Sequence, residues 1–136
     1  MSCTTILVGV DIGTSSIKAV GFDIDGNRLF EYRKPSSLIA FEDKPYWFEQ
    51  DPHEILHNTL ELIRYVLSTC KDQEIAIGFS STSPSLIPID SEGKPLYNVI
   101  AWMDRRAHKE KAESDREIGA DTIYSPCLYW LSASVS

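Results

Sequence analysis

The sequence predicts an α/β domain built on a mixed β-sheet, and three stretches carry that prediction. Two near-continuous apolar runs, residues 6–10 and 17–22, flank a short polar segment, which is the pattern of a tight hairpin with both strands buried. A helical pattern follows residue 51, and a further apolar run comes at residues 74–79. Strand, helix and strand in this order imply a right-handed crossover that places the last strand parallel to its neighbour.

The polar segment between the first two runs is a candidate phosphate-binding turn. Gly13 allows a ligand to approach the backbone closely, and the next three residues offer N–H groups and hydroxyls to phosphate oxygens. These residues are Thr14, Ser15 and Ser16. Asp11 ends an apolar strand, where a lone carboxylate is costly to bury, and Mg²⁺ carried by a nucleotide would supply its partner. Lys18 adds a positive charge on the second strand. The alternative is an ordinary turn held by a local side-chain hydrogen bond.

A third strand is expected over residues 28–33, where apolar and polar side chains alternate. The turn before it, at residues 23–27, contains Gly and Asn, which tolerate positive φ. This strand completes an antiparallel meander with the first two. Residues 35–45 are polar and interrupted by proline, so they are expected to form a surface loop.

The helix is expected to begin at Asp51. The Asp51 side chain can cap the helix, Pro52 suits its first position, and Glu54 completes an arrangement like a capping box. Apolar residues then recur at helical spacing, which predicts one apolar stripe along about five turns. They are Leu56, Leu60, Ile63 and Leu67.

A serine-rich segment, residues 80–85, follows the apolar run at 74–79. It lies at the carboxyl end of the expected strand, which is the edge where ligands bind in open α/β sheets. The alternative is a plain loop to the next strand. That strand is expected at residues 86–90, with a turn at 91–95 that returns the chain toward Trp102.

Trp102 and Asp104 follow this turn and are candidate ligand-binding residues. The Trp102 ring is a flat apolar surface, and the Asp104 carboxylate can accept hydrogen bonds. The alternative is that Asp104 caps a helix that ends at Gly119. The two roles are compatible.

Composition narrows the classes of partner. The net charge of −7 argues against nucleic acid or an anionic membrane surface as a partner, and suits a soluble metabolic protein. No apolar run is long enough to span a bilayer, and the first residues do not resemble a secretory signal, so a cytoplasmic location is expected. The three cysteines have neither disulfide-framework nor zinc-site spacing.

Three motifs together resemble the FGGY carbohydrate kinases, a family of the actin, hexokinase and sugar-kinase superfamily. They are D-x-G-T-S at residues 11–15, W-x-E-Q-D-P at 47–52 and W-x-D-x-R at 102–106. The resemblance implies a ribonuclease-H-like fold, present here in incomplete form. It also implies a kinase that transfers phosphate from ATP, with Mg²⁺, to a hydroxyl of a sugar or polyol.

The same resemblance assigns roles to residues. Nucleotide binding falls to Asp11, Gly13, Thr14, Ser15, Ser16 and Lys18, with Asp11 as the metal ligand. Substrate binding falls to Ser83, Pro84, Trp102 and Asp104. The family commonly has larger side chains at the positions of Ser83 and Pro84, which leaves the identity of the substrate open. Trp47, Glu49 and Gln50 are interpreted as family markers with an architectural role.

Residues 1–119 are expected to be the N-terminal portion of the family's first domain, and residues 120–136 a divergent or truncated tail. The resemblance implies that the aspartate acting as catalytic base lies beyond Ser136, so the chain is expected to be inactive alone. The full-length protein could form a homo-oligomer. The alternative function is that of a non-catalytic remnant that binds nucleotide or pairs with another subunit. An actin-like ATPase fits less well, because only the sugar kinases combine the second and third motifs.

Overall fold

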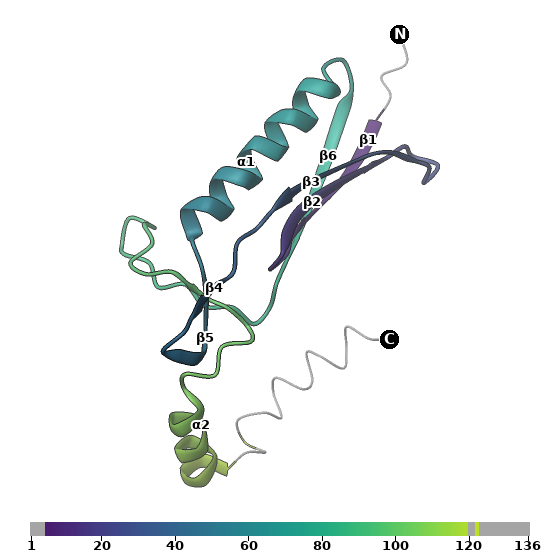
Figure 1. Cartoon of the computed structure of the whole chain (residues 1–136). Helices are drawn as coiled ribbons and strands as arrows, with labels where there is room; N and C mark the ends of the chain where they lie inside the picture. Colours follow the sequence, from purple (N-terminus) through teal and green to yellow (C-terminus); the bar gives the residue numbers. More distant parts are fainter. Residues whose placement is uncertain (1–4, 120–121, 123–136) are drawn as a thin grey trace. The chain divides into compact units, whose positions relative to one another are not determined.

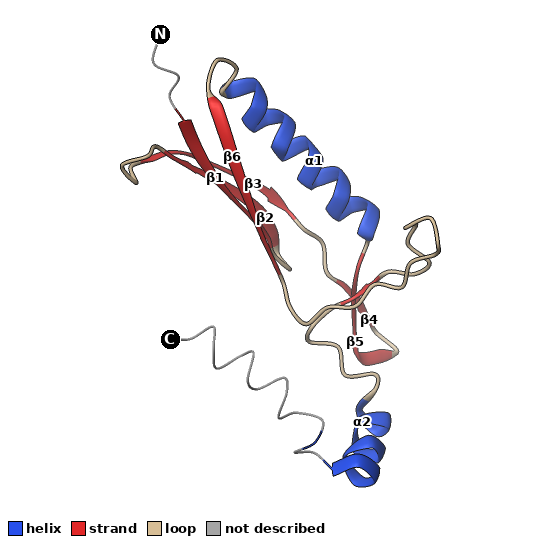
Figure 2. Cartoon of the chain, turned by 180° about the vertical axis from the view of Figure 1, so that it is seen from behind, coloured by secondary structure: helices blue, strands red, loops and turns tan. Residues whose placement is uncertain are grey.

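The computed structural model of the protein describes residues 5–119 and 122. The chain divides into two units, Met1–Asp104 and Arg105–Ser136, which are considered separately. The first unit contains a four-stranded sheet, a long helix along one face of that sheet, and a small three-stranded sheet (Figure 1). In the described part of this unit, the opposite face of the large sheet carries no helix (Figure 2).

The large sheet has the strand order β3-β2-β1-β6. Its strands are β1 (Thr5–Ile12), β2 (Ser16–Phe22), β3 (Arg28–Pro35) and β6 (Glu74–Ser81). β1 pairs antiparallel with β2 and parallel with β6, and β2 pairs antiparallel with β3. The predicted hairpin, meander and parallel crossover are therefore all present, and the sheet is mixed.

Helix α1 (Pro52–Thr69) packs on the sheet and closes the core. Alternate residues of β1 and β2 point toward the helix, as the two-residue period of a strand requires. The buried residues of the core are Ile6, Val8, Val10, Ile17, Ala19, Leu62, Val66 and Cys70. Residues of β1 on the other face, including Gly9 and Asp11, are exposed.

The start of α1 agrees with the sequence, apart from one contact. The Asp51 carboxylate accepts a hydrogen bond from the N–H of His53 at 2.8 Å, and Pro52 is the first helical residue. Glu54 does not close a capping box: its carboxylate instead accepts from the N–H and hydroxyl of Ser37, at 3.2 and 2.9 Å. Glu54 therefore ties the helix to the segment after β3.

The apolar stripe predicted for α1 is present, but it is not the side of the helix that faces the core. Leu60, in that stripe, is 40% exposed, whereas Leu62 is 2% exposed. The residues that face the sheet are Ile55, Thr59, Leu62 and Val66, which also recur at helical spacing. The helix carries two neighbouring apolar stripes, and spacing alone does not show which one meets the strands.

The small sheet has the order β4-β5-β7 and contains a hairpin where a loop was expected. β4 (Ile39–Phe41) pairs antiparallel with β5 (Lys44–Gln50), which pairs with β7 (Val99–Ile100). The pairing shifts register between Ala40 and Phe41. This irregularity accommodates Pro45, because proline is tolerated in strands at edges and bulges.

The strand predicted at residues 86–90 is also not formed as a regular strand. Only two isolated bridges are present, Leu86 with Ile100 and Ile89 with Pro95. The turn between them is confirmed, since the Asp90 carboxylate accepts from the N–H groups of Glu92 and Lys94, each at 2.8 Å.

The second unit contains α2 (His108–Ser114), followed by a π-helical turn, η1 (Asp115–Gly119). The helix cap is Ala107, so the prediction that Asp104 caps this helix is wrong. Gly119 has a φ of +89° and ends the helical segment as expected. The predicted tail, residues 120–136, lies outside the described residues except for residue 122. No helix in the described part of the chain is long and apolar enough to cross a membrane.

Candidate functional site

The turn between β1 and β2 is tight, and its first residue, Gly13, has no room for a side chain unless the backbone shifts. The N–H of Gly13 donates to the Ser16 carbonyl at 3.0 Å. A Cβ on Gly13 would lie 2.8 Å from that carbonyl oxygen, closer than side chains approach backbone atoms. The Asp11 Oδ2 lies 3.8 Å from the same Cβ position. The Asp11 carboxylate is therefore at the turn, as predicted, and does not point away from it.

Three carbonyl groups of the turn, those of Thr14, Ser15 and Ser16, accept hydrogen bonds from the protein. Gln50 Nε2 donates to the Thr14 carbonyl at 3.1 Å, and the Ser36 N–H donates to the Ser15 carbonyl at 3.1 Å. Among the described residues, the N–H groups of Thr14 and Ser15 have no acceptor. A turn with bound carbonyls and available amides suits an anion such as phosphate.

Asp11 lies between two polar residues on neighbouring strands. It pairs in register with Lys18 on β2 and with Ser80 on β6. Side chains in register on adjacent strands share one face of the sheet, so Lys18 is beside the carboxylate. Lys18 Nζ also lies 4.0 Å from Glu31.

One carboxylate at this position fits a magnesium ion that arrives with a nucleotide. Mg²⁺ usually binds one or two carboxylates, with phosphate oxygens and waters completing the octahedron. Among the described residues, no group of three or more acidic, cysteine or histidine side chains could hold a metal by itself. The donor set at Asp11 therefore suits a nucleotide-borne ion and does not suit a permanent metal centre.

Ser83 and Pro84 follow the carboxyl ends of β1 and β6. The Thr82 N–H donates to the Ile12 carbonyl at 3.2 Å, which continues the β1–β6 pairing by one residue. Ser83 and Pro84 come directly after this contact and are exposed, joined by a cis peptide bond. The structure thus brings this loop to the same end of the sheet as the turn.

Trp102 makes a direct contact with the turn. Its indole Nε1 donates to the Thr14 hydroxyl at 3.2 Å, although the two residues are 88 positions apart. Asp104 binds elsewhere: its Oδ2 accepts from the Phe48 N–H in β5 at 2.7 Å. Asp104 therefore fixes the Trp102 segment to β5, which explains why it does not cap α2.

The last residues of β5 make hydrogen bonds both to the turn and to the segment that leads to Trp102. Glu49 is 1% exposed, and its two carboxylate oxygens accept from the Tyr97 hydroxyl and the Asn98 amide, each at 2.8 Å. Gln50 is 3% exposed and donates to the turn. The architectural interpretation of these residues agrees with the contacts. In the sequence, this role is indicated by two polar residues between an aromatic segment and the helix cap. If such residues are buried, they must have hydrogen-bond partners.

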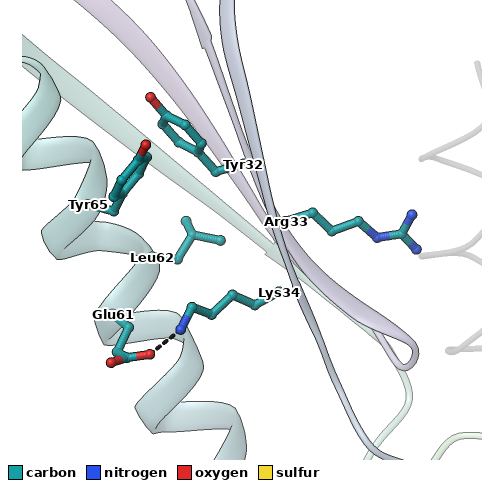
Figure 3. Close-up of a pocket in the computed structure, with 6 residues that line it drawn as sticks. All are labelled: Tyr32, Arg33, Lys34, Glu61, Leu62 and Tyr65. Atoms are coloured by element: carbon teal, nitrogen blue, oxygen red, sulfur yellow. Dashed lines mark hydrogen bonds and ion pairs between the residues drawn. The ribbon is translucent and has the colours of Figure 1, made fainter.

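A separate cavity of about 340 Å³ lies between β3 and α1, and none of the predicted site residues is among the residues that line it (Figure 3). Lys34 and Glu61 form an ion pair at one end, and Tyr32 and Tyr65 lie at the other, while Arg33 points away. The hydrogen bond from Lys34 lowers the pKa of the Glu61 carboxyl. These groups satisfy one another, and they join the edge strand to the helix.

The model of the "FGGY family of carbohydrate kinases, N-terminal domain" matches residues 6–134. The chain belongs to this family. The match extends into the segment for which a divergent or truncated tail was predicted.

Two solved structures share the fold of this FGGY chain. The gluconate kinase from Lactobacillus acidophilus is 30% identical, with a TM-score of 0.80 over 90% of this chain and 24% of that one. The xylulose kinase from the same organism is 30% identical, with a TM-score of 0.79 over 89% of this chain and 24% of that one. The predicted fold class, that of the actin and hexokinase superfamily, is confirmed.

Among curated proteins, a glycerol kinase from Petrotoga mobilis is 34% identical over 107 residues, which cover 76% of this chain and 21% of that protein. The FGGY chain thus spans about a fifth to a quarter of the length of the relatives it matches.

Proposed function

We propose that this FGGY chain supplies the phosphate-binding turn and part of the acceptor site for ATP-dependent phosphorylation of a sugar or polyol. The observation that carries the proposal is the hydrogen bond from Trp102 to Thr14. It joins the candidate substrate segment to the candidate phosphate turn, and phosphoryl transfer requires donor and acceptor to be held in line and in contact. Similarity to proteins named gluconate, xylulose and glycerol kinases supports this class of acceptor.

The residues of the turn have distinct roles in this proposal. The N–H groups of Thr14 and Ser15 donate to phosphate oxygens, and Lys18 contributes positive charge beside them. Asp11 would hold the nucleotide-borne Mg²⁺, directly or through its waters. When bound, Mg²⁺ neutralises charge that develops on the phosphates during transfer.

The acceptor side is formed by residues from two segments. Trp102 offers its ring to the carbon face of the acceptor, and Ser83 and Pro84 contribute a hydroxyl and a small apolar surface. Asp104 acts by fixing the Trp102 segment and by offering carboxylate oxygen to acceptor hydroxyls. No residue of this chain is assigned as the catalytic base, so we propose that the chain binds both ligands without turnover. Residues 1–119 would then be the N-terminal portion of the first kinase domain, in a cytoplasmic protein whose partners are small molecules.

The test compares two matched substitutions of exposed aspartates. Asp11→Asn removes the charge at the turn, and Asp25→Asn removes the same charge at the β2–β3 turn, where no side-chain contact of Asp25 is found among the described residues. In calorimetric titrations with ATP–Mg²⁺, we expect Asp11→Asn to weaken binding about tenfold or more and Asp25→Asn to leave it unchanged. Equal affinities for the two variants would refute the assignment of the turn.

A second candidate function is that of a non-catalytic module that pairs with another copy of the chain. The outer edge of β6 has no partner strand among the described residues, and Phe79 on this strand is exposed. Such edges pair readily with other strands. Sedimentation of the wild-type chain and of Phe79→Lys tests this function: a dimer that the substitution abolishes would support it, and a monomeric wild type would exclude it.

A further inference from the structure

We propose that Gln50 is a positioning residue, which sets the direction of the amides in the phosphate turn. The inference rests on the proposed function of that turn. Gln50 is the last residue of β5, lies next to the helix cap Asp51, and is almost fully buried. Its amide Nε2 donates both to the Thr14 carbonyl, at 3.1 Å, and to the Ser36 hydroxyl, at 2.9 Å.

These contacts fix two successive peptide groups. Gln50 holds the Thr14 carbonyl, and the N–H of its partner Ser36 holds the Ser15 carbonyl at 3.1 Å. In a trans peptide, the carbonyl of one residue and the N–H of the next point in opposite directions. Holding the Thr14 carbonyl toward β5 therefore turns the Ser15 N–H away from β5. That N–H is one of the two amides with no acceptor among the described residues.

The same residue links the turn to the acceptor segment. Thr14 is bonded through its carbonyl to Gln50 and through its hydroxyl to Trp102. Two residues before Gln50 in β5, the Phe48 N–H is bonded to Asp104. The contacts form a closed ring that runs from the turn through β5 to the Trp102 segment and back. A change at Gln50 should therefore be detectable at Trp102 without any ligand present.

The chemistry requires an amide at this position. A carboxylate of the same shape has no proton to donate to the Thr14 carbonyl and would repel that oxygen, while a leucine would leave the carbonyl without its partner. We therefore expect Gln50→Glu and Gln50→Leu to weaken ATP–Mg²⁺ binding about tenfold. The matched control is Gln73→Glu, which makes the same change at an exposed turn.

The experiment uses three measurements on the wild-type chain and these variants. Thermal unfolding checks that each variant is folded, and calorimetry gives the affinity for ATP–Mg²⁺. The NMR signal of the Trp102 indole N–H, assigned with Trp102→Phe, together with hydrogen exchange of the Ser36 amide, reports the ligand-free turn. We expect Gln50→Glu to shift the indole signal and to speed exchange at Ser36 about tenfold or more, while Gln73→Glu and Asp11→Asn change neither.

The outcomes separate the two claims. If Asp11→Asn weakens nucleotide binding but Gln50→Glu does not, the positioning role of Gln50 is overturned and the proposed function stands. If the wild-type chain binds no nucleotide, the proposed function fails, and an unmoved indole signal in Gln50→Glu then overturns the positioning role as well. If both Gln50 variants fail to fold, Ser36→Ala serves as the test, because it removes one acceptor of the Gln50 amide. A shifted Trp102 indole signal in this variant would support the positioning role, and an unmoved signal would overturn it.

Discussion

Substituting Gly13 by alanine tests the geometry of the turn directly, because the structure supplies a matched control, Gly9, on the preceding strand β1. The new Cβ would lie 2.8 Å from the Ser16 carbonyl oxygen, whereas ordinary contacts begin at 3.4 Å. That oxygen also accepts the hydrogen bond that closes the turn, at 3.0 Å. Backbone must therefore move by about half an ångström, which costs about 2 kcal/mol on the scale of overpacked sites.

This cost should lower the melting temperature by about 7–10 °C for a domain of this size. The control, Gly9→Ala, places a Cβ on the exposed face of β1 with no atom within 4 Å. Its effect should be below about 0.5 kcal/mol. Urea unfolding gives both free energies, and titration with ATP–Mg²⁺ should show lost binding for Gly13→Ala alone. Equal unfolding midpoints for the two variants would show that the turn is not as tight as described.

Two further predictions concern α1. Leu62→Ala should lower the free energy of unfolding by about 2–5 kcal/mol, whereas Leu60→Ala should lower it by less than about 1 kcal/mol, because only Leu62 faces the sheet. Urea unfolding measures both losses. Equal losses would contradict the packing of the Leu62 side of α1 on the sheet. The Lys34 contact lowers the pKa of the Glu61 carboxyl in the folded state. This contact therefore stabilises the fold at a pH above the unfolded-state pKa of Glu61, and the stabilisation is lost as the pH falls through the folded-state pKa. With Glu61→Gln, the melting temperature should fall slightly less steeply between about pH 6 and pH 3 than it does in the wild-type chain. Thermal melts measure this difference, with Glu74→Gln as the control.

Patterns that depend on neighbours in sequence were predicted well. The buried hairpin, the meander and the parallel crossover follow from apolar runs and one intervening helix, and the Asp51 cap follows from local chemistry. These patterns are local in sequence, so they can be recognised without knowledge of the tertiary structure. The phosphate-binding role of the turn residues stays a prediction, because glycine and small hydroxyl side chains are also common in ordinary turns.

Features that depend on tertiary contacts were missed. The local sequence predicts a loop at the β4–β5 hairpin, because its short strands are stabilised by pairing with β7, about 50 residues away. Asp104 resembled a helix cap, yet its carboxylate is bonded to β5. For α1, the sequence pattern predicts one apolar stripe, whereas the structure packs the neighbouring stripe on the sheet, and this choice depends on how the helix lies on the strands.

The contacts around the turn differ sharply from those of the nearby serine loop, and this difference bears on how the chain could evolve. Thr14 is bonded on two sides, so its replacement would disturb residues from β5 and the Trp102 segment together. Ser83 and Pro84 are exposed beyond the last paired residues. If these two residues touch the acceptor as proposed, substitutions at them could change which sugar or polyol is accepted and leave the proposed phosphate turn unchanged.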